Sequence, residues 1–254
     1  MPEASGVAEA VVLVKASPQV SQKHGETVCC AGVTLEGKWV RLYPVTFRKL
    51  EDAQQFKRWD LIRYKWRRSK DDHRPESYRV EQESIEVVGN LAKRDRPNLL
   101  SRLEVTGLNA IAAEGKSLAL LRPQQPKFLI APKAADEIAQ ERLDYASIGK
   151  QRDMFNTRVL VPLEPCPVSF KYRYRTDDGE REGTCQDWET DATFFNWRHQ
   201  YGEAKALREM ERVFGEEYPA KGMTFAMGTH SRYPDVWLIN GLIRVDEVTQ
   251  MMLL

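Results

Sequence analysis

Apolar and polar residues alternate through the first ninety residues with the period of two that is typical of β-strands. Residues 10–16 and 26–34 have the composition of strands, and a glycine-containing turn at 35–38 joins the second of these to the alternating segment 39–43. Residues 60–68 and 78–88 continue the pattern. The alternation therefore predicts a small, mostly antiparallel β unit over residues 1–90, either barrel-like or strongly curled.

The pattern changes after residue 90. Prolines divide residues 90–149 into short pieces, with helical spacing at 134–145, and residues 170–175 then alternate strictly before an Asp-Asp-Gly turn. Apolar residues at helical spacing predict one long helix over about 188–214, and strands are expected at 223–228 and 236–245. The predicted class is α+β: an N-terminal antiparallel β barrel-like unit, then a mixed α+β region with one long helix packed on a β-sheet. Residues 1–90 and 91–254 form two units or one continuous domain.

Composition narrows the function classes. The chain has 254 residues, of which 42% are hydrophobic, and we find no apolar run near the roughly 20 residues of a membrane helix. The four cysteines include no CxxC pair, so neither a disulfide framework nor a zinc ribbon is indicated. Walker A, GxGxxG, GxSxG and HExxH motifs are absent. We expect a cytoplasmic protein without a bound metal or cofactor and without a membrane partner.

Charge is concentrated in one segment. Residues 56–74 carry eight Lys or Arg against three Asp, a net charge of +5, while the whole chain is only +1. Residues 170–175 form a second alternating basic and aromatic strand. Because phosphates bind Lys and Arg, two cationic strands indicate a polyanion ligand. The cations predicted to contact it are Arg63, Lys65, Arg67, Arg68, Lys171, Arg173 and Arg175.

The aromatic residues of these strands allow two interpretations. Exposed aromatic faces stack on unpaired bases, and Trp59 or Tyr78 is available for stacking. Alternation also allows the ordinary arrangement of a half-buried strand, with the aromatic side chains in the core and the cations outside. Under that interpretation neighbouring Asp and Glu residues simply neutralise the cations.

A separate group of polar residues suggests a catalytic site. Asp187 and Glu189 open the long helix, where a carboxylate most often accepts backbone N–H groups as a cap. His230 and Arg232 lie in a loop between the last two strands, where side chains are available to a ligand. If these four residues converged in one cleft, they would form an acid–base or phosphate-binding site.

Three blocks of sequence resemble an uncharacterised family of conserved prokaryotic proteins. They are residues 27–47 (TVCCAGVTLEGKWVRLYPVTF), 74–78 (RPESY), and the pair 186–189 (QDWE) with 228–241 (GTHSRYPDVWLING). The resemblance implies a family that spans the whole chain, and it implies no reaction. Residues 56–64 (FKRWDLIRY) also resemble the turn that enters a strand in PUA-like and OB-like barrels, which often bind RNA or modified bases.

These observations leave three hypotheses. The leading one is a nucleic-acid-binding protein, for DNA or RNA, whose two cationic strands contact the phosphate backbone. The second is an enzyme acting on a nucleotide or nucleic acid around His230, Asp187, Glu189 and Arg232. The third is a structural subunit whose cationic strands meet an acidic protein partner in a larger assembly.

Overall fold

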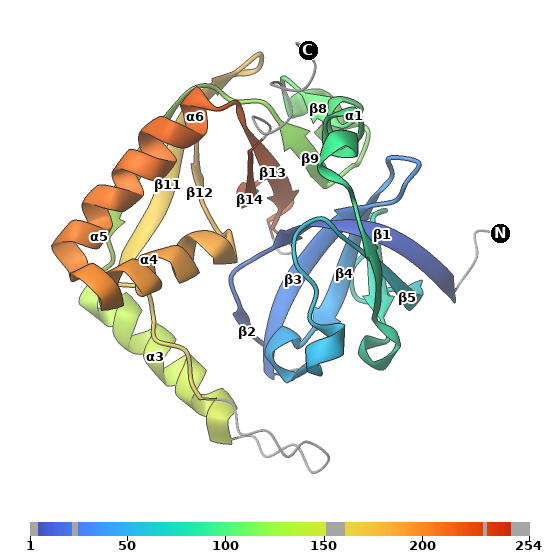
Figure 1. Ribbon diagram of the computed structural model, residues 1–254, viewed down its shortest axis with the longest axis horizontal. Coiled ribbons are helices and arrows are strands. Elements are labelled where there is room, and N and C mark those ends of the chain that lie inside the picture. Colours follow the sequence, from blue (N-terminus) through green and yellow to red (C-terminus); the bar gives the residue numbers. More distant parts are fainter. Residues whose placement is uncertain (1–4, 22–24, 151–160, 231–232, 245–254) are drawn as a thin grey trace.

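The computed structural model describes residues 5–21, 25–150, 161–230 and 233–244, and it has the predicted α+β class (Figure 1). Its N-terminal part is a closed barrel of five strands. The strands follow one another around the barrel in the order β1 (Ser5–Lys15), β3 (Gly25–Val33), β4 (Trp39–Val45), β6 (Ser77–Val80) and β5 (Asp60–Arg68), and β5 pairs again with β1.

Strand β1 closes the barrel because it is long enough to pair with two neighbours. Its residues 5–11 pair with β5 and its residues 11–15 pair with β3, both antiparallel. The pairing of β4 with β6 is parallel, so the barrel is mixed. Short strands β2 (Gln19–Ser21) and β7 (Glu86–Asn90) extend the sheet beside β3 and β5.

Apolar side chains from alternate positions fill the barrel. Ile62 and Tyr64 of β5 are buried with Val12 of β1 and Leu42 of β4. The predicted strand at 78–88 is instead two strands, β6 and β7, separated by the 3₁₀ turn Gln82–Ser84. The other 3₁₀ turns of this region are Phe47–Lys49, Asp52–Gln54 and Lys93–Asp95.

The second part contains two smaller sheets and most of the helices. Strands β10 (Gln124–Pro132), β11 (Val168–Thr176) and β12 (Gly179–Thr184) form one antiparallel sheet. The other has the order β14 (Trp237–Arg244), β13 (Met223–Thr229), β9 (Leu118–Leu121), β8 (Glu104–Val105). The helices are α1 (Arg96–Ser101), α2 (Asn109–Ala113), α3 (Ala135–Lys150), α4 (Trp188–Tyr201), α5 (Glu203–Met210), the π-helical turn η5 (Glu211–Glu217) and α6 (Tyr218–Ala220).

The single helix predicted over 188–214 is two helices that meet at Gly202. This residue has φ +81° and ψ 161°, a conformation that interrupts a helix and that glycine adopts at little cost. Beyond it, the helical path runs on from α5 through η5 to α6, along one side of the molecule in Figure 1. Ala206 and Met210 of this path are fully buried beside Tyr172 of β11. The predicted packing of a long helix on a sheet is confirmed. The helical path that packs there runs from Glu203 to Ala220, later at both ends than the predicted 188–214.

The barrel and the second part share a hydrophobic cluster. Val11 and Leu13 of β1 pack with Leu120 of β9, Ala226 of β13 and Ile243 of β14. All five are at most 1% exposed, so this contact is as dry as a domain core. Within the described residues, no helix combines the length and the apolar character needed to cross a membrane.

Candidate nucleic-acid interface

The cations of β5 point outward, as the alternation predicts. Arg63, Lys65 and Arg67 are exposed, whereas Ile62 and Tyr64 between them are buried in the barrel. Arg63 is nevertheless neutralised, because its guanidinium lies 2.8 Å from Glu9 of β1 and 3.6 Å from Glu86 of β7. Arg63 is therefore a weaker candidate for binding phosphate than the two cations that follow it.

Lys65 and Arg67 lie on a part of the sheet with a second arginine. Arg79 of β6 stands directly opposite Arg67 in the antiparallel pairing, and both side chains point away from the barrel interior. Tyr43 of β4 pairs with Arg79 on its other side and is 38% exposed. We call Lys65, Arg67, Arg79 and Tyr43 the barrel-face patch. Among the described residues, none of its three cations forms an ion pair with a carboxylate.

Arg68 lies at the rim of the barrel-face patch. Its guanidinium carbon is 4.9 Å from the centre of the Tyr78 ring, and its Nη1 donates a hydrogen bond of 2.9 Å to the Pro75 carbonyl. Tyr78 also packs edge-on against Trp66, with ring centres 4.7 Å apart. One face of Tyr78, a predicted stacking residue, is thus already in contact with a cation of the protein.

The other predicted stacking residue, Trp59, is held by its surroundings. Its φ is +75°, its backbone N–H donates to the Val12 carbonyl at 2.8 Å, and its ring packs against the apolar cluster shared by the two parts. The guanidinium carbon of Arg96 lies 4.7 Å from the ring centre. Trp59 therefore fixes the entry into β5, and its ring is partly covered.

The second cationic row differs from the first in its partners. Glu182 of β12 lies opposite Arg173 and is 3.3 Å from its guanidinium and 3.7 Å from the Lys171 ammonium. Arg175 stands opposite Glu180, without an ion pair among the described side chains. Figure 1 shows β11 and β5 on opposite sides of the molecule, so the two cationic rows do not converge.

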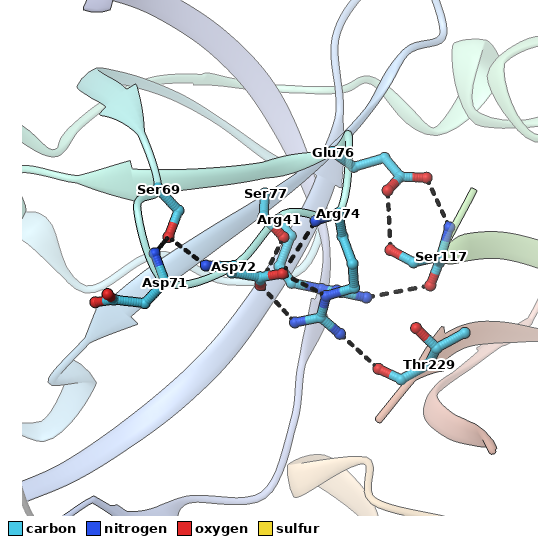
Figure 2. A network of polar contacts seen from close by, with 9 residues as sticks. All are labelled: Arg41, Ser69, Asp71, Asp72, Arg74, Glu76, Ser77, Ser117 and Thr229. Atoms are coloured by element: carbon cyan, nitrogen blue, oxygen red, sulfur yellow. Dashed lines mark hydrogen bonds and ion pairs between the residues drawn. The ribbon is translucent and has the colours of Figure 1, made fainter. Parts of the chain in front are cut away.

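A polar network holds the loop that connects β5 to β6 (Figure 2). Two nitrogens of Arg74 donate to the Asp72 carboxylate at 2.6 and 2.8 Å, and Ser77 donates to it at 2.8 Å. Partial burial by itself would raise the pKa of Asp72, but these hydrogen bonds and the charge of Arg74 outweigh it and lower the pKa to about 2. Arg74 also donates to the Thr229 carbonyl at 2.7 Å, which ties the loop to β13.

The same network continues into the interface between the barrel and the second part. The Glu76 carboxylate accepts from the backbone N–H and the hydroxyl of Ser117, both at 2.9 Å (Figure 2). Arg41 of β4, only 2% exposed, donates to the Ser117 carbonyl at 3.1 Å. The ordinary Cβ of a larger residue in place of Gly228 would lie 3.4 Å from Arg41 and only 2.3 Å from the Asn240 amide. Residues of three segments that carry the sequence resemblance, 27–47, 74–78 and 228–241, thus meet at this interface.

Of the predicted catalytic residues that the structure describes, Asp187 and Glu189 lie together and His230 lies apart from them. Asp187 caps α4 and is 2% exposed: it accepts from the Glu189 N–H at 3.1 Å, the Leu242 N–H at 2.7 Å and the Arg58 guanidinium at 2.9 Å. Glu189 lies 3.3 Å from the same guanidinium. The backbone N–H of His230 donates to the Val236 carbonyl, just before the start of β14. Leu242 lies near the other end of this strand, about 20 Å from Val236 at 3.3 Å per strand residue.

The imidazole ring of His230 stacks on the ring of Tyr233, with ring centres 5.1 Å apart. Arg232, the fourth predicted residue, lies outside the described residues. Among the residues that are described, no three His, Cys, Asp or Glu side chains group as metal ligands.

Sequence reasoning missed two members of the barrel-face patch. Arg79 follows the RPESY block, and Tyr43 lies in the RLYP segment, so both belong to segments that the sequence predicts to be strands. Their position beside Arg67 depends on the pairing of β6 with both β4 and β5. No local pattern predicts that pairing.

The chain matches two family models that together extend over nearly its whole length. They are Domain of unknown function (DUF8758), over residues 7–103, and Domain of unknown function (DUF8757), over residues 103–253. Since the second match covers more than half of the chain, the protein belongs to the DUF8757 family. No curated protein matches the chain. The matches meet at residue 103, and the boundary predicted at residue 90 stays a prediction.

Proposed function

We propose that the protein binds nucleic acid through the barrel-face patch. The observation that carries this proposal is the pairing of Arg67 with Arg79 on adjacent strands, without a carboxylate partner among the described residues. Like charges directly opposite each other destabilise a sheet by up to about 1 kcal/mol. A phosphate between the two guanidinium groups would offset that cost and accept hydrogen bonds from both.

The remaining members of the patch suit a flexible polyanion. Lys65 lies two residues before Arg67 on the same face of β5, and Arg68 lies at the rim beside Tyr78, so a fourth cation stands near the three of the patch. Tyr43 exposes part of its ring beside Arg79 and would stack on an unpaired base, which contributes about 1–3 kcal/mol per base. The proposed ligand is therefore single-stranded DNA or RNA. A PUA-like or OB-like relationship of the barrel would agree with this function by analogy of fold alone.

Several cations of the sequence-based hypothesis contribute less to the proposed interface. Arg63, Lys171 and Arg173 already have carboxylate partners, so phosphate binding there would require an ion pair to be replaced. The observations favour one cationic face, β5 with β6, over two.

The experiment is a binding titration with a fluorescent 12-nucleotide DNA and RNA at low salt, read by anisotropy. Reversing both charges of the arginine pair, Arg67→Glu with Arg79→Glu, should weaken binding at least tenfold. The matched control, Arg173→Glu with Arg175→Glu, changes the net charge equally on the other row and should change affinity less than about twofold. Circular dichroism checks that both variants are folded.

The opposite result would contradict the proposal. If the wild-type chain binds neither oligonucleotide, or if the control loses affinity and the patch variant does not, the barrel-face patch is not the nucleic-acid interface. If an acidic protein from the native host binds the barrel-face patch after nuclease treatment, and no oligonucleotide binds, the structural-subunit hypothesis would be supported instead.

A further inference from the structure

A cavity of about 490 Å³ lies away from the barrel-face patch, between the barrel and the helices α3 and α4. Its walls come from the corner after β1, the end of β10, one face of α3, and the first turns of α4. Pockets of about 300–1,000 Å³ are the usual size for small organic ligands. The cavity therefore has room for a ligand of that class.

Asp191 of α4 lies deep in this wall and keeps part of its surface accessible, because it faces the cavity. Burial raises the pKa of Asp191 to about 6, although a hydrogen bond from the Ser17 hydroxyl and the charge of Lys133 act in the opposite direction. Among the described residues, the Ser17 hydroxyl donates a hydrogen bond to the Asp191 carboxylate. A buried carboxylate with one neutral donor is energetically costly, so a cationic group beside it would be favourable.

Lys133, whose charge acts on Asp191, is already paired with another carboxylate. Lys133 Nζ lies 2.7 and 2.9 Å from the two carboxylate oxygens of Glu141 on α3. Asp191 and Glu141 thus share one cation, which leaves the inner wall with an excess negative charge. Three further charged residues line the cavity, and two of them are acidic: Glu137, Glu164 and Lys171.

Aromatic side chains complete the walls. Trp188 and Phe195 of α4 line the cavity. In the sequence they lie before and after Asp191 at helical spacing. Tyr145 of α3 lines it as well, and its hydroxyl donates to the Pro18 carbonyl at 3.3 Å. A carboxylate near aromatic rings is a set of groups by which proteins recognise organic cations, through an ion pair and cation–π contacts. One face of each α4 ring already contacts a cation of the protein: the Lys15 ammonium lies 5.8 Å from the Trp188 ring centre, and the Arg198 guanidinium carbon lies 4.9 Å from that of Phe195.

We infer that this cavity binds a small organic cation, whose ammonium or guanidinium group pairs with Asp191 and whose apolar body lies against Trp188 and Phe195. The inference is independent of nucleic-acid binding, because the cavity shares no residue with the barrel-face patch. The two can therefore fail separately.

The test uses isothermal titration calorimetry of the full chain with a matched pair of probes. Benzylguanidinium carries the cation, and benzylurea has nearly the same shape without the charge. The wild-type chain should bind benzylguanidinium at least tenfold more tightly than benzylurea. Asp191→Asn, which keeps the acceptor for Ser17, should remove this preference. Glu203→Gln on the exposed surface of α5 removes the same charge elsewhere and should change nothing.

A second variant keeps the test decisive if Asp191→Asn alters the fold. Ala192→Leu retains every charge and fills the cavity that Ala192 lines, so it should weaken benzylguanidinium binding at least tenfold. Equal affinity for the two probes, no heat from benzylguanidinium at millimolar concentration, or an unchanged preference in both variants would overturn the inference. Oligonucleotide binding should be the same in all of these proteins.

Discussion

Asp72 stabilises the loop beside the barrel-face patch through hydrogen bonds that require its ionised form. Its pKa is lowered from 3.8 to about 2 in the folded protein, a shift that corresponds to about 2 kcal/mol of stability. The unfolded chain binds the proton more tightly, so this stability is fully present well above pH 3.8 and is lost as the pH falls through about 2. Asp72→Asn should therefore lower the free energy of unfolding by about 2 kcal/mol at pH 7.

The pH dependence separates this cause from a general loss of packing. At pH 3 the wild-type carboxylate contributes only about half of its value at pH 7, so the difference between Asp72→Asn and the wild type should halve. Urea unfolding at pH 7, 4 and 3, followed by circular dichroism, measures it. Glu83→Gln, on the exposed turn after β6, is the control for removal of one negative charge. A loss that is the same at pH 7 and pH 3 would refute the reasoning.

Three further outcomes are expected in unfolding experiments. Asp191→Asn should gain stability between pH 4 and pH 8 relative to the wild type, by up to about 3 kcal/mol, because the unfolded wild-type chain ionises near pH 3.8 and the folded one only near pH 6, so the wild type loses stability over that range; an equal effect at both pH values would contradict this. Arg58→Met leaves the buried Asp187 carboxylate without its cation and should cost about 3–5 kcal/mol, whereas Arg212→Met at an exposed pair should cost less than about 1 kcal/mol; equal melting temperatures would count against it. Gly202→Ala should cost about 1 kcal/mol or more, since φ is +81°, and a neutral effect would show that the α4–α5 junction tolerates a side chain.

Local patterns predict the orientation of side chains in this fold. A strand's period of two is a local property, and it correctly separates Ile62 and Tyr64 from Arg63, Lys65 and Arg67. The same reasoning separates Tyr172 from Arg173 on β11. The α+β class and the barrel-like N-terminal unit follow from the same patterns.

Pairing between distant strands decides which cations keep their charge, and it is less visible in the sequence. The tight turn that pairs Thr176 with Gly179 places Glu182 opposite Arg173. The register of this one hairpin is therefore enough to predict that Glu182 neutralises Arg173. The pairing of Arg67 with Arg79 is of another kind, because β6 reaches β5 after a long loop and also pairs in parallel with β4. Only the folded barrel brings them together.

The salt dependence of oligonucleotide binding tests the central claim most directly. Each neutralised phosphate of a single strand contributes about −0.7 to the slope of log K against log salt, so the four cations Lys65, Arg67, Arg68 and Arg79 predict a slope of about −3. Reversing Arg67 and Arg79 should reduce its magnitude to about 1, and the Arg173 and Arg175 control should leave it unchanged. A wild-type slope near zero, or one that both double variants alter equally, would contradict binding through the barrel-face patch.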